Sequence, residues 1–220
     1  GAGESEIEID AGGGVRLDGS LNVPVGAWGV VLFVHGSGSS RYSPRNRMVA
    51  GRLQDAGMAT LLFDLLDPAE ERDRANVFDI PLLASRLLAA VRRLRDVPEV
   101  RDLPVGFFGA STGAAAALVA AAQPRSGAVA VVSRGGRPDL AADSLPLVRA
   151  PTLLIVGGAD SEVIDLNMTA MSRMTCHTEL RIVPRAGHLF EAPGELEQVA
   201  DLAVDWFTTQ LMQVAGDVTA

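Results

Sequence analysis

The sequence contains no lysine, and its charge balance is acidic. All 19 basic residues are arginines, whereas Asp and Glu together number 27, so the formal net charge is −8 at pH 7. A protein that binds nucleic acid broadly needs a basic face to meet the phosphates. We therefore expect no nucleic-acid partner.

Cysteine and histidine are also scarce. The single cysteine, Cys176, excludes an internal disulfide and any thiolate-rich zinc site. There are only three histidines, and the pair that Cys176 forms with His177 is not a metal site. We predict that the protein needs neither a metal ion nor an organic cofactor.

Long apolar runs are missing as well. The apolar stretches have the length of strands or are broken by glycine and charges, which argues against a membrane span. No basic segment followed by an apolar one opens the sequence, so we expect no secretory signal and a cytoplasmic location. The 220 residues suit one globular domain. We place this domain at residues 1–213 and expect residues 214–220 to form a frayed C-terminal tail.

The pattern of apolar residues predicts an α/β fold. Two alternating segments joined by glycines, residues 5–10 and 15–24, indicate an N-terminal antiparallel hairpin. The continuous apolar runs that follow, as strands covered on both faces require, are residues 29–36, 58–64, 103–109, 127–133, 150–158 and 179–184. Residues 78–97 and 195–213 have the apolar spacing of amphipathic helices. The alternation indicates a mostly parallel sheet with helices on both faces.

Ligands bind to such a sheet beyond the carboxyl ends of its strands. Polar residues and glycines stand directly after several of the predicted strands. They are His35, Gly36, Ser37, Gly38, Asp64, Ser111, Arg134, Asp160 and His188. We therefore look for the functional site among these residues.

Ser111 lies in an unusual stretch, GFFGASTGAAAALVAAA, where it stands between Gly109 and Gly113. The pattern Gly-x-Ser-x-Gly between a strand and a helix is typical of a turn that carries a nucleophilic serine. Such a serine has a strained backbone, and the two glycines relieve the crowding around it. The turn also places the hydroxyl at the N-terminus of the next helix, where amides favour negative charge.

The same stretch superficially resembles the dinucleotide-binding turn of short-chain dehydrogenases. That turn follows the first strand of its sheet, has a third glycine, and works with a catalytic Tyr-Lys pair. Here Ala115 and Ala116 fill the place of that glycine, and the sequence has one tyrosine and no lysine. The dinucleotide interpretation is therefore disfavoured, whereas simple tight packing of a strand against a helix stays open as an alternative.

A nucleophilic serine needs a base, and the base needs a carboxylate that orients it. Asp160 follows one predicted strand, and His188 lies in the loop after the next. The chain order Ser, Asp, His is the order expected for this strand-turn-helix context. We predict Ser111 as nucleophile, His188 as base and Asp160 as the orienting acid. The alternative is that His188 is a surface loop residue and Asp160 a turn former.

An acyl-transfer intermediate needs backbone donors for its oxyanion. The residue after the nucleophile, Thr112, supplies one amide, and the segment after the first parallel strand must supply the other. We predict the amides of Ser37 and Thr112 as these donors. We expect the side chain of His35 to fix the loop rather than to take part in the chemistry.

Four motifs together resemble the α/β-hydrolase fold, in particular its small members related to dienelactone hydrolase. They are HGSGSS (35–40), GFFGASTG (106–113), LLIVGGAD (153–160) and AGHLF (186–190). The likeness covers essentially the whole chain. The sequence most resembles hydrolase domains that occur alone or fused to phosphoribosyltransferases. It implies a serine hydrolase with a small-molecule ester or lactone substrate.

One departure from the family pattern widens the expected substrate class. Dienelactone hydrolases use a cysteine nucleophile, whereas this chain has Ser111, so the resemblance implies ester or thioester cleavage as readily as lactone cleavage. Residues 134–149 are too few for a cap domain, and we expect an open site. A non-catalytic binding or regulatory module and an acyltransferase stay open as alternatives, and the sequence indicates no oligomeric state.

Arginines near the predicted strand ends favour an anionic substrate. Arg41 follows the loop of the oxyanion donors, and Arg134 follows the strand at 127–133. A guanidinium binds carboxylate or phosphate through paired hydrogen bonds. We predict Arg41 and Arg134 as substrate-binding residues. The alternative is that they cap helices or pair with the acidic loop at residues 67–73.

Overall fold

The computed structural model describes residues 3–219 and contains one eight-stranded sheet with the order β1-β2-β4-β3-β5-β6-β7-β8. The strands are β1 Glu4–Gly12, β2 Val15–Asn22, β3 Val30–Val34, β4 Ala59–Phe63, β5 Val105–Ala110, β6 Ala128–Arg134, β7 Thr152–Gly157 and β8 Thr178–Val183. β2 pairs antiparallel with both β1 and β4, and all other neighbours pair in parallel. The predicted mostly parallel sheet with an N-terminal hairpin is therefore confirmed.

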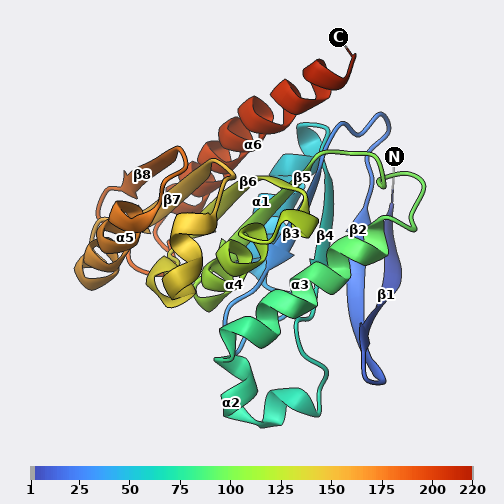
Figure 1. The fold of residues 1–220 in the computed structure, drawn as a ribbon. Helices are drawn as coiled ribbons and strands as arrows, with labels where there is room; N and C mark the ends of the chain where they lie inside the picture. The colour runs from blue at the N-terminus through green and yellow to red at the C-terminus, as the bar shows by residue number, and fades with distance from the viewer. Residues whose placement is uncertain (1–2, 220) are drawn as a thin grey trace.

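Helices cover both faces of this sheet, as Figure 1 shows. α3 (Ile80–Leu94) and α4 (Thr112–Ala121) pack on one face, and α1 (Pro44–Asp55) and α6 (Glu195–Thr219) pack on the other. The remaining helical segments are α2 Arg74–Val77, α5 Ser161–Arg173, η1 Glu70–Arg72, η2 Pro124–Ser126 and η3 Pro138–Leu147. Only the short segment η3 stands between β6 and β7, so there is no cap domain.

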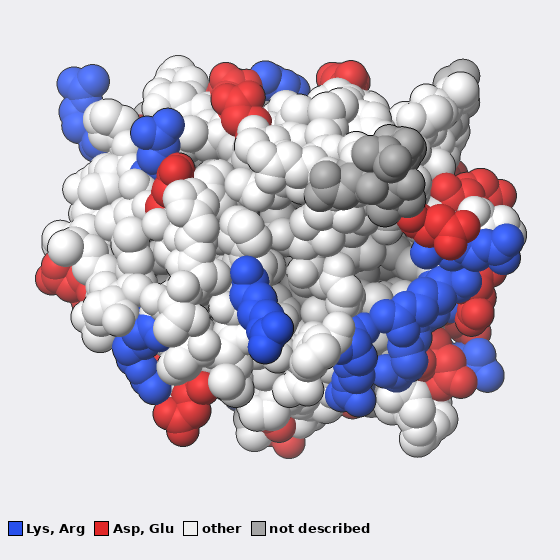
Figure 2. Space-filling model, turned by 45° about the horizontal axis from the view of Figure 1, so that its top comes forward, with Lys and Arg blue, Asp and Glu red and all other residues white. Residues whose placement is uncertain are grey.

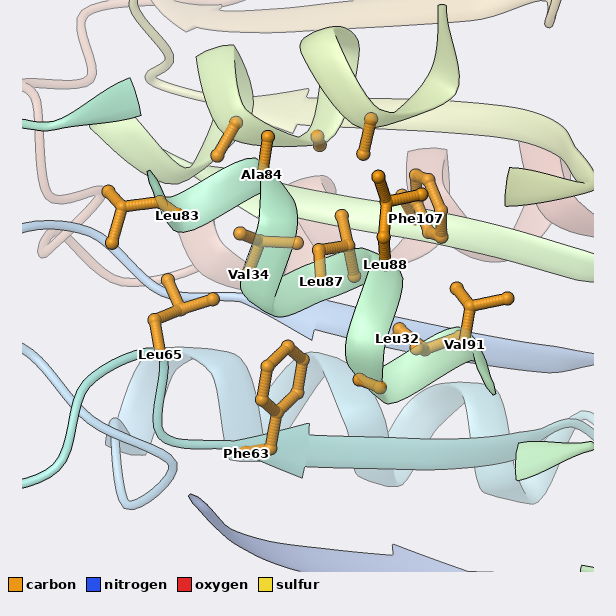
Figure 3. Close-up of a cluster of buried hydrophobic side chains, with 14 of the residues drawn as sticks. Leu32, Val34, Phe63, Leu65, Leu83, Ala84, Leu87, Leu88, Val91 and Phe107 are labelled. Carbon is orange, nitrogen blue, oxygen red and sulfur yellow. The ribbon is translucent and has the colours of Figure 1, made fainter. Parts of the chain in front are cut away.

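Each face of the sheet has its own apolar core. In Figure 3, Leu87 and Val91 of α3 lie over Leu32, Val34 and Phe107 of the sheet. The core on the opposite face includes Val31, Phe33, Phe108 and Phe207. Successive residues of a strand point to opposite faces. A strand between two cores therefore needs an unbroken apolar run, which is what the sequence has at these strands.

Capping residues set the starts of two helices. The hydroxyl of Ser43 accepts a hydrogen bond from the amide of Asn46 at 3.2 Å, and α1 begins at the next residue. The carboxylate of Asp79 accepts one from the amide of Leu82 at 3.1 Å, directly before α3. These bonds satisfy amides that lack an intrahelical acceptor. The helix predicted at residues 78–97 therefore begins only at Ile80.

The last helix is longer than we predicted. α6 is described to Thr219, so residues 214–219 of the expected tail are helical, whereas residue 220 lies outside the described part of the chain. Val214 is half-buried and borders a hollow that Trp28 and Leu103 also line. The last turns of α6 thus run beside this hollow.

Charged side chains are unevenly spread over the surface. On the face drawn in Figure 2, basic side chains gather in one stripe that acidic side chains border, and uncharged surface covers most of the rest. No helix in residues 3–219 is long and apolar enough to cross a membrane. The described residues also hold no cluster of three or more histidine, cysteine or acidic side chains placed to bind a metal ion.

An ion pair holds the loop between β4 and α3. The buried side chain of Arg86 donates to both carboxylate oxygens of Glu70, at 2.7 and 2.6 Å, and to the carbonyl of Leu65 at 3.4 Å. The hydrogen bonds from Arg86 hold the pKa of Glu70 below its ordinary value. The loop is thus fixed by a charge pair that is largely shielded from water.

Replacing Glu70 with Gln should lower the free energy of unfolding by about 3 kcal/mol at neutral pH, because the buried guanidinium of Arg86 loses its carboxylate. The folded pKa of Glu70 is depressed, so its contribution is present above the unfolded pKa of about 4.3 and is lost as the pH falls through the folded pKa. Urea unfolding of both proteins should show a difference that shrinks with acidity. A difference that stays constant with pH would contradict this account.

Candidate active site

Two strand ends that lead into helices carry Ser111 and Asp160. Ser111 is the N-cap residue of α4, directly after β5, and Asp160 is the N-cap residue of α5, shortly after β7. Ser43 and Asp79 cap their helices, but neither Ser111 nor Asp160 uses its side chain in this way. Both side chains instead bond to His188, in the loop between β8 and α6.

The three side chains form a hydrogen-bonded chain. Ser111 Oγ lies 3.0 Å from His188 Nε2, and His188 Nδ1 lies 3.0 Å from Asp160 Oδ2. A carboxylate can only accept, so Nδ1 of the neutral ring carries the proton and Nε2 is left to accept from the serine hydroxyl. The side chain of Asp160 is 19% exposed and that of His188 is 41% exposed. The arrangement can therefore take a proton from Ser111 at a point that a small molecule can reach.

The backbone of Ser111 is strained. Its φ of 51° and ψ of −122° lie in a region that costs a residue with a side chain about 1–3 kcal/mol. Two hydrogen bonds hold it there. The Ser111 amide donates to the carbonyl of Arg134 at 3.3 Å, and the amide of Arg137 donates to the Ser111 carbonyl at 3.1 Å. The last residue of β6 and the segment that follows it therefore fix the serine in place.

The two glycines of the serine turn are required by close packing. A Cβ added to Gly109 would lie 2.5 Å from the Cα of Ala114, and one added to Gly113 would lie 2.1 Å from the carbonyl oxygen of Val34. Real Cβ atoms do not approach other atoms so closely. The turn thus brings the N-terminus of α4 against β3 and β5, as the spacing of the glycines around Ser111 predicts.

The loop after β3 passes directly over the serine. A Cβ on Gly36 would lie 3.1 Å from the Cβ of Ser111 and 3.6 Å from its Oγ. The buried His35 accepts a hydrogen bond at Nε2 from the amide of Leu65 at 3.1 Å, so its Nδ1 carries the proton and donates to the Gly36 carbonyl at 2.9 Å. Burial lowers the pKa of His35. The ring is held neutral and fixes the loop, which agrees with the prediction for this residue.

Of the two predicted oxyanion donors, the Ser37 amide is already bonded in this structure. It donates to Oγ1 of Thr112 at 3.0 Å. Thr112 is the first residue of α4, so its own amide has no acceptor within the helix. Only the two amides were predicted from the sequence, whereas the bond from the Ser37 amide to the Thr112 hydroxyl was not. This hydroxyl joins the loop after β3 to the start of α4, and no local pattern announces such a contact.

The loop that carries His188 has anchors that the sequence analysis also missed. Arg45, near the start of α1, donates from Nε to the carbonyl of Leu189 at 2.9 Å. Phe190 is buried and has a φ of 54°. Gly135, with a φ of +52°, faces the ring, since an added Cβ would lie 3.3 Å from His188 Nδ1. The position of Gly135 directly after a strand was the one available signal.

The two arginines predicted to bind substrate have different surroundings. Arg41 bonds Asp64 at 2.5 Å and lies 3.6 Å from Glu6, so carboxylates already balance its charge. Arg134 is 6% exposed, its Nε has no hydrogen-bond partner, and it forms no ion pair within residues 3–219. Burial, together with the charge of Arg45, lowers the pKa of Arg134 to about 10. Arg134 is therefore a buried, charged and unpartnered group whose backbone touches Ser111.

A hollow of about 170 Å³ opens beside the loop after β3. One side is the loop itself, and the other is formed by Leu83 of α3 and by residues between β4 and α3, which are aliphatic except for Glu71. The residues that line it include Gly36, Ser37, Leu65, Leu66, Val77 and Leu83. Since Gly36 touches Ser111, an apolar group in this hollow would lie beside the serine.

Known proteins share both the sequence and the fold. The profile of the Dienelactone hydrolase family matches residues 17–211. A dienelactone hydrolase from Anabaena variabilis is 56% identical, with a TM-score of 0.92 over 96% of this chain and 99% of that one. Est1E from Butyrivibrio proteoclasticus is only 16% identical but has the same fold, with a TM-score of 0.80 over 94% of this chain and 99% of its own.

Two curated proteins from strains of Mycobacterium tuberculosis are each 60% identical over 208 residues. They are provisionally named phosphoribosyl transferases. The similarity covers 94% of this chain and 47% of each relative. The chain therefore spans about half the length of the curated relatives it matches.

Proposed function

Because the chain belongs to the dienelactone hydrolase family, we propose that it is a serine hydrolase that cleaves a carboxylic ester, lactone or thioester through an acyl-enzyme. The observation that carries this proposal is the chain of hydrogen bonds from Ser111 through His188 to Asp160. The strained turn at Ser111 supports it, because such strain persists where the surrounding structure holds a functional group in place.

The reaction begins when Ser111 Oγ attacks the carbonyl carbon and His188 Nε2 takes the hydroxyl proton. His188 then gives this proton to the leaving alcohol or thiol as the bond to the carbonyl carbon breaks. In the second half, His188 takes a proton from water, which attacks the acyl carbonyl carbon. His188 then returns this proton to Ser111 Oγ as the bond between Oγ and the acyl carbon breaks, which releases the acid and restores the free serine and the neutral ring. Asp160 accepts the hydrogen bond from the Nδ1–H group of His188 throughout. It therefore keeps the ring in one tautomer and stabilises its charged form.

The oxyanion of each tetrahedral intermediate binds the amides of Thr112 and Ser37. Thr112 contributes the first free amide of α4, where the helix dipole favours negative charge. The Ser37 amide bonds to the Thr112 hydroxyl in the free protein. The substrate oxygen therefore shares this amide with the hydroxyl or replaces it as the acceptor. A donor of this kind contributes about 100- to 1,000-fold to the rate.

Replacing Ser111 with Ala should lower kcat for ester hydrolysis by about a millionfold, because the three side chains act as a unit. Labelling by a fluorophosphonate probe should disappear with it. The exposed serine Ser172 on α5 provides the matched control, and Ser172→Ala should keep both properties. Activity that survives in Ser111→Ala would contradict the assignment. A parent protein that neither reacts with the probe nor hydrolyses esters would favour the non-catalytic module instead.

Thr112 allows a test of the oxyanion loop. Thr112→Val keeps the shape of the side chain but removes the acceptor of the Ser37 amide, so the two donors lose their link. We expect kcat to fall about tenfold with little change in KM, as the loss of one hydrogen bond would produce. Thr112→Ser keeps the hydroxyl and should retain most of kcat. Equal losses in the two variants would show that only packing at this position matters.

The proposed substrate carries an anionic group that binds Arg134. A buried charge is costly unless it is paired, and Arg134 lacks a partner within the described residues. Its pKa of about 10 keeps it charged at neutral pH. A carboxylate or phosphate on the substrate would supply the missing partner, and the hollow beside Gly36 would hold an apolar portion. Arg41 is not needed in this role, because Asp64 already pairs with it.

Arg134→Gln should separate charged from neutral substrates. For an ester that bears a carboxylate we expect kcat/KM to fall about 10- to 100-fold, the effect of one charged hydrogen-bonded contact. For the methyl-capped neutral analogue we expect little change, since the backbone carbonyl that bonds Ser111 is kept. Arg41→Gln serves as the control and should not discriminate between the two substrates. Equal losses on both esters in Arg134→Gln would contradict anion binding at this residue.

A further inference from the structure

β8 is an edge of the sheet, and no strand pairs with its outer side within residues 3–219. Figure 1 shows it beside β7 at the end of the sheet opposite to β1. The neighbouring helices pack further inward, α5 mainly against η3 and α6 mainly against α1 and β6. Ile182 is 47% exposed. An open edge of this kind offers amide and carbonyl groups that can pair with another strand.

The hydrogen bonds to β7 show which peptide groups face outward. The Thr152 amide donates to the His177 carbonyl at 2.9 Å, and the Gly158 amide donates to the Val183 carbonyl at 2.8 Å. In a parallel pair, alternate residues of a strand bond to the same neighbour. The peptide groups between them, at residues 178, 180 and 182, therefore point away from the sheet.

We propose that two copies of the chain pair antiparallel along β8, about a two-fold axis that passes beside Leu180. In this register Leu180 lies opposite Leu180 of the partner subunit, and Thr178 lies opposite Ile182 of the partner subunit. All three outward-facing residues are then hydrogen-bonded, and the pairing uses no group that β7 needs. The two sheets would join into one, and the exposed apolar side chain of Ile182 would be covered.

Charge favours the same register. Glu179 lies opposite Arg181 of the partner subunit, and Arg181 lies opposite Glu179 of the partner subunit. Side chains directly opposite each other on antiparallel strands have Cβ atoms about 4.5–5.5 Å apart, close enough for an ion pair. Arg181 has no ion-pair partner within the described chain, and Glu179 meets only the ring of His177, at 3.4 Å. The strand is thus complementary to itself.

The other edge of the sheet has the opposite character. β1 carries acidic residues at alternate positions on one face, namely Glu4, Glu6, Glu8 and Asp10. Glu4, Glu6 and Glu8 already have arginine partners in the same chain, at 3.2, 3.6 and 2.9 Å, so they offer no unpaired charge to a second copy. The row also contains no basic residue that could face these carboxylates across a two-fold axis. β8 has no such run of like charge. Self-pairing is therefore disfavoured at β1 and favoured at β8.

Analytical ultracentrifugation over a range of protein concentrations tests this proposal. The result does not depend on whether the catalytic assignment is right. We expect the parent chain to form a dimer. Arg181→Glu and Glu179→Arg each create two like-charge pairs, so each should raise the dissociation constant at least about tenfold. The double variant restores opposite charges and should restore the dimer. Arg101→Glu, a change of the same kind away from β8, is the control and should have no effect.

A disulfide test fixes the register. In a Cys176→Ser background, Leu180→Cys should form a disulfide between copies on oxidation, because the paired Cα atoms lie about 5.5 Å apart. Ile182→Cys should not, since its two copies lie about 13 Å apart in this register. Circular dichroism and thermal unfolding confirm that each variant is folded. A parent chain that stays monomeric, a dimer insensitive to charge reversal, or equal cross-linking of both cysteines would overturn the proposal.

Discussion

The strained backbone of Ser111 is the constraint on which the rest of the candidate site depends. It depends on Gly109 and Gly113, where a Cβ would collide with neighbouring backbone, and Gly36 in the loop above leaves room for the Ser111 side chain. The alanines at 114–117 and 120 are fully buried and allow α4 to lie close to the sheet. The last residue of β6 and the segment after it hold the serine through both of its backbone groups. The loop after β3, the end of β5, α4 and the end of β6 must therefore pack together to present one hydroxyl.

Much of the fold follows from local patterns in the sequence. β3 to β7 are mainly apolar because each lies between two cores, and that requirement is visible in the letters alone. The exceptions are the buried polar residues Thr60, Ser133, Arg134 and Thr152. The ends of helices are less predictable, since they depend on single contacts. Asp79 starts α3 by capping it. The predicted end of α6 was too early, and its added turns border a hollow that Trp28, from the other end of the chain, also lines. No window of sequence contains both Trp28 and Val214.

In the candidate site, too, some features follow from local sequence and others depend on distant contacts. Ser111, Asp160 and His188 stand after the ends of β5, β7 and β8. These positions predict that the three side chains meet, because the strands are parallel and their carboxyl ends share one edge of the sheet. Which arginines form ion pairs could not be predicted, because each pair depends on a carboxylate that is distant in the sequence. Arg41 is neutralised by Asp64 and Glu6, whereas Arg134 is left without a carboxylate. Arg45 donates a hydrogen bond to the carbonyl of Leu189, which is 144 residues away in the sequence.

The start of α5 lacks a side-chain cap because Asp160, its N-cap residue, bonds to His188 instead. Asp is a residue type that commonly caps helices, and Asp160 stands at the N-cap position of α5 without doing so. Such a cap is worth about 1 kcal/mol. The carboxylate is instead held by His188. One carboxylate oxygen thus orients the imidazole while neither oxygen caps α5, so the protein forgoes the stability of a cap at the place where it keeps the ring in a single orientation.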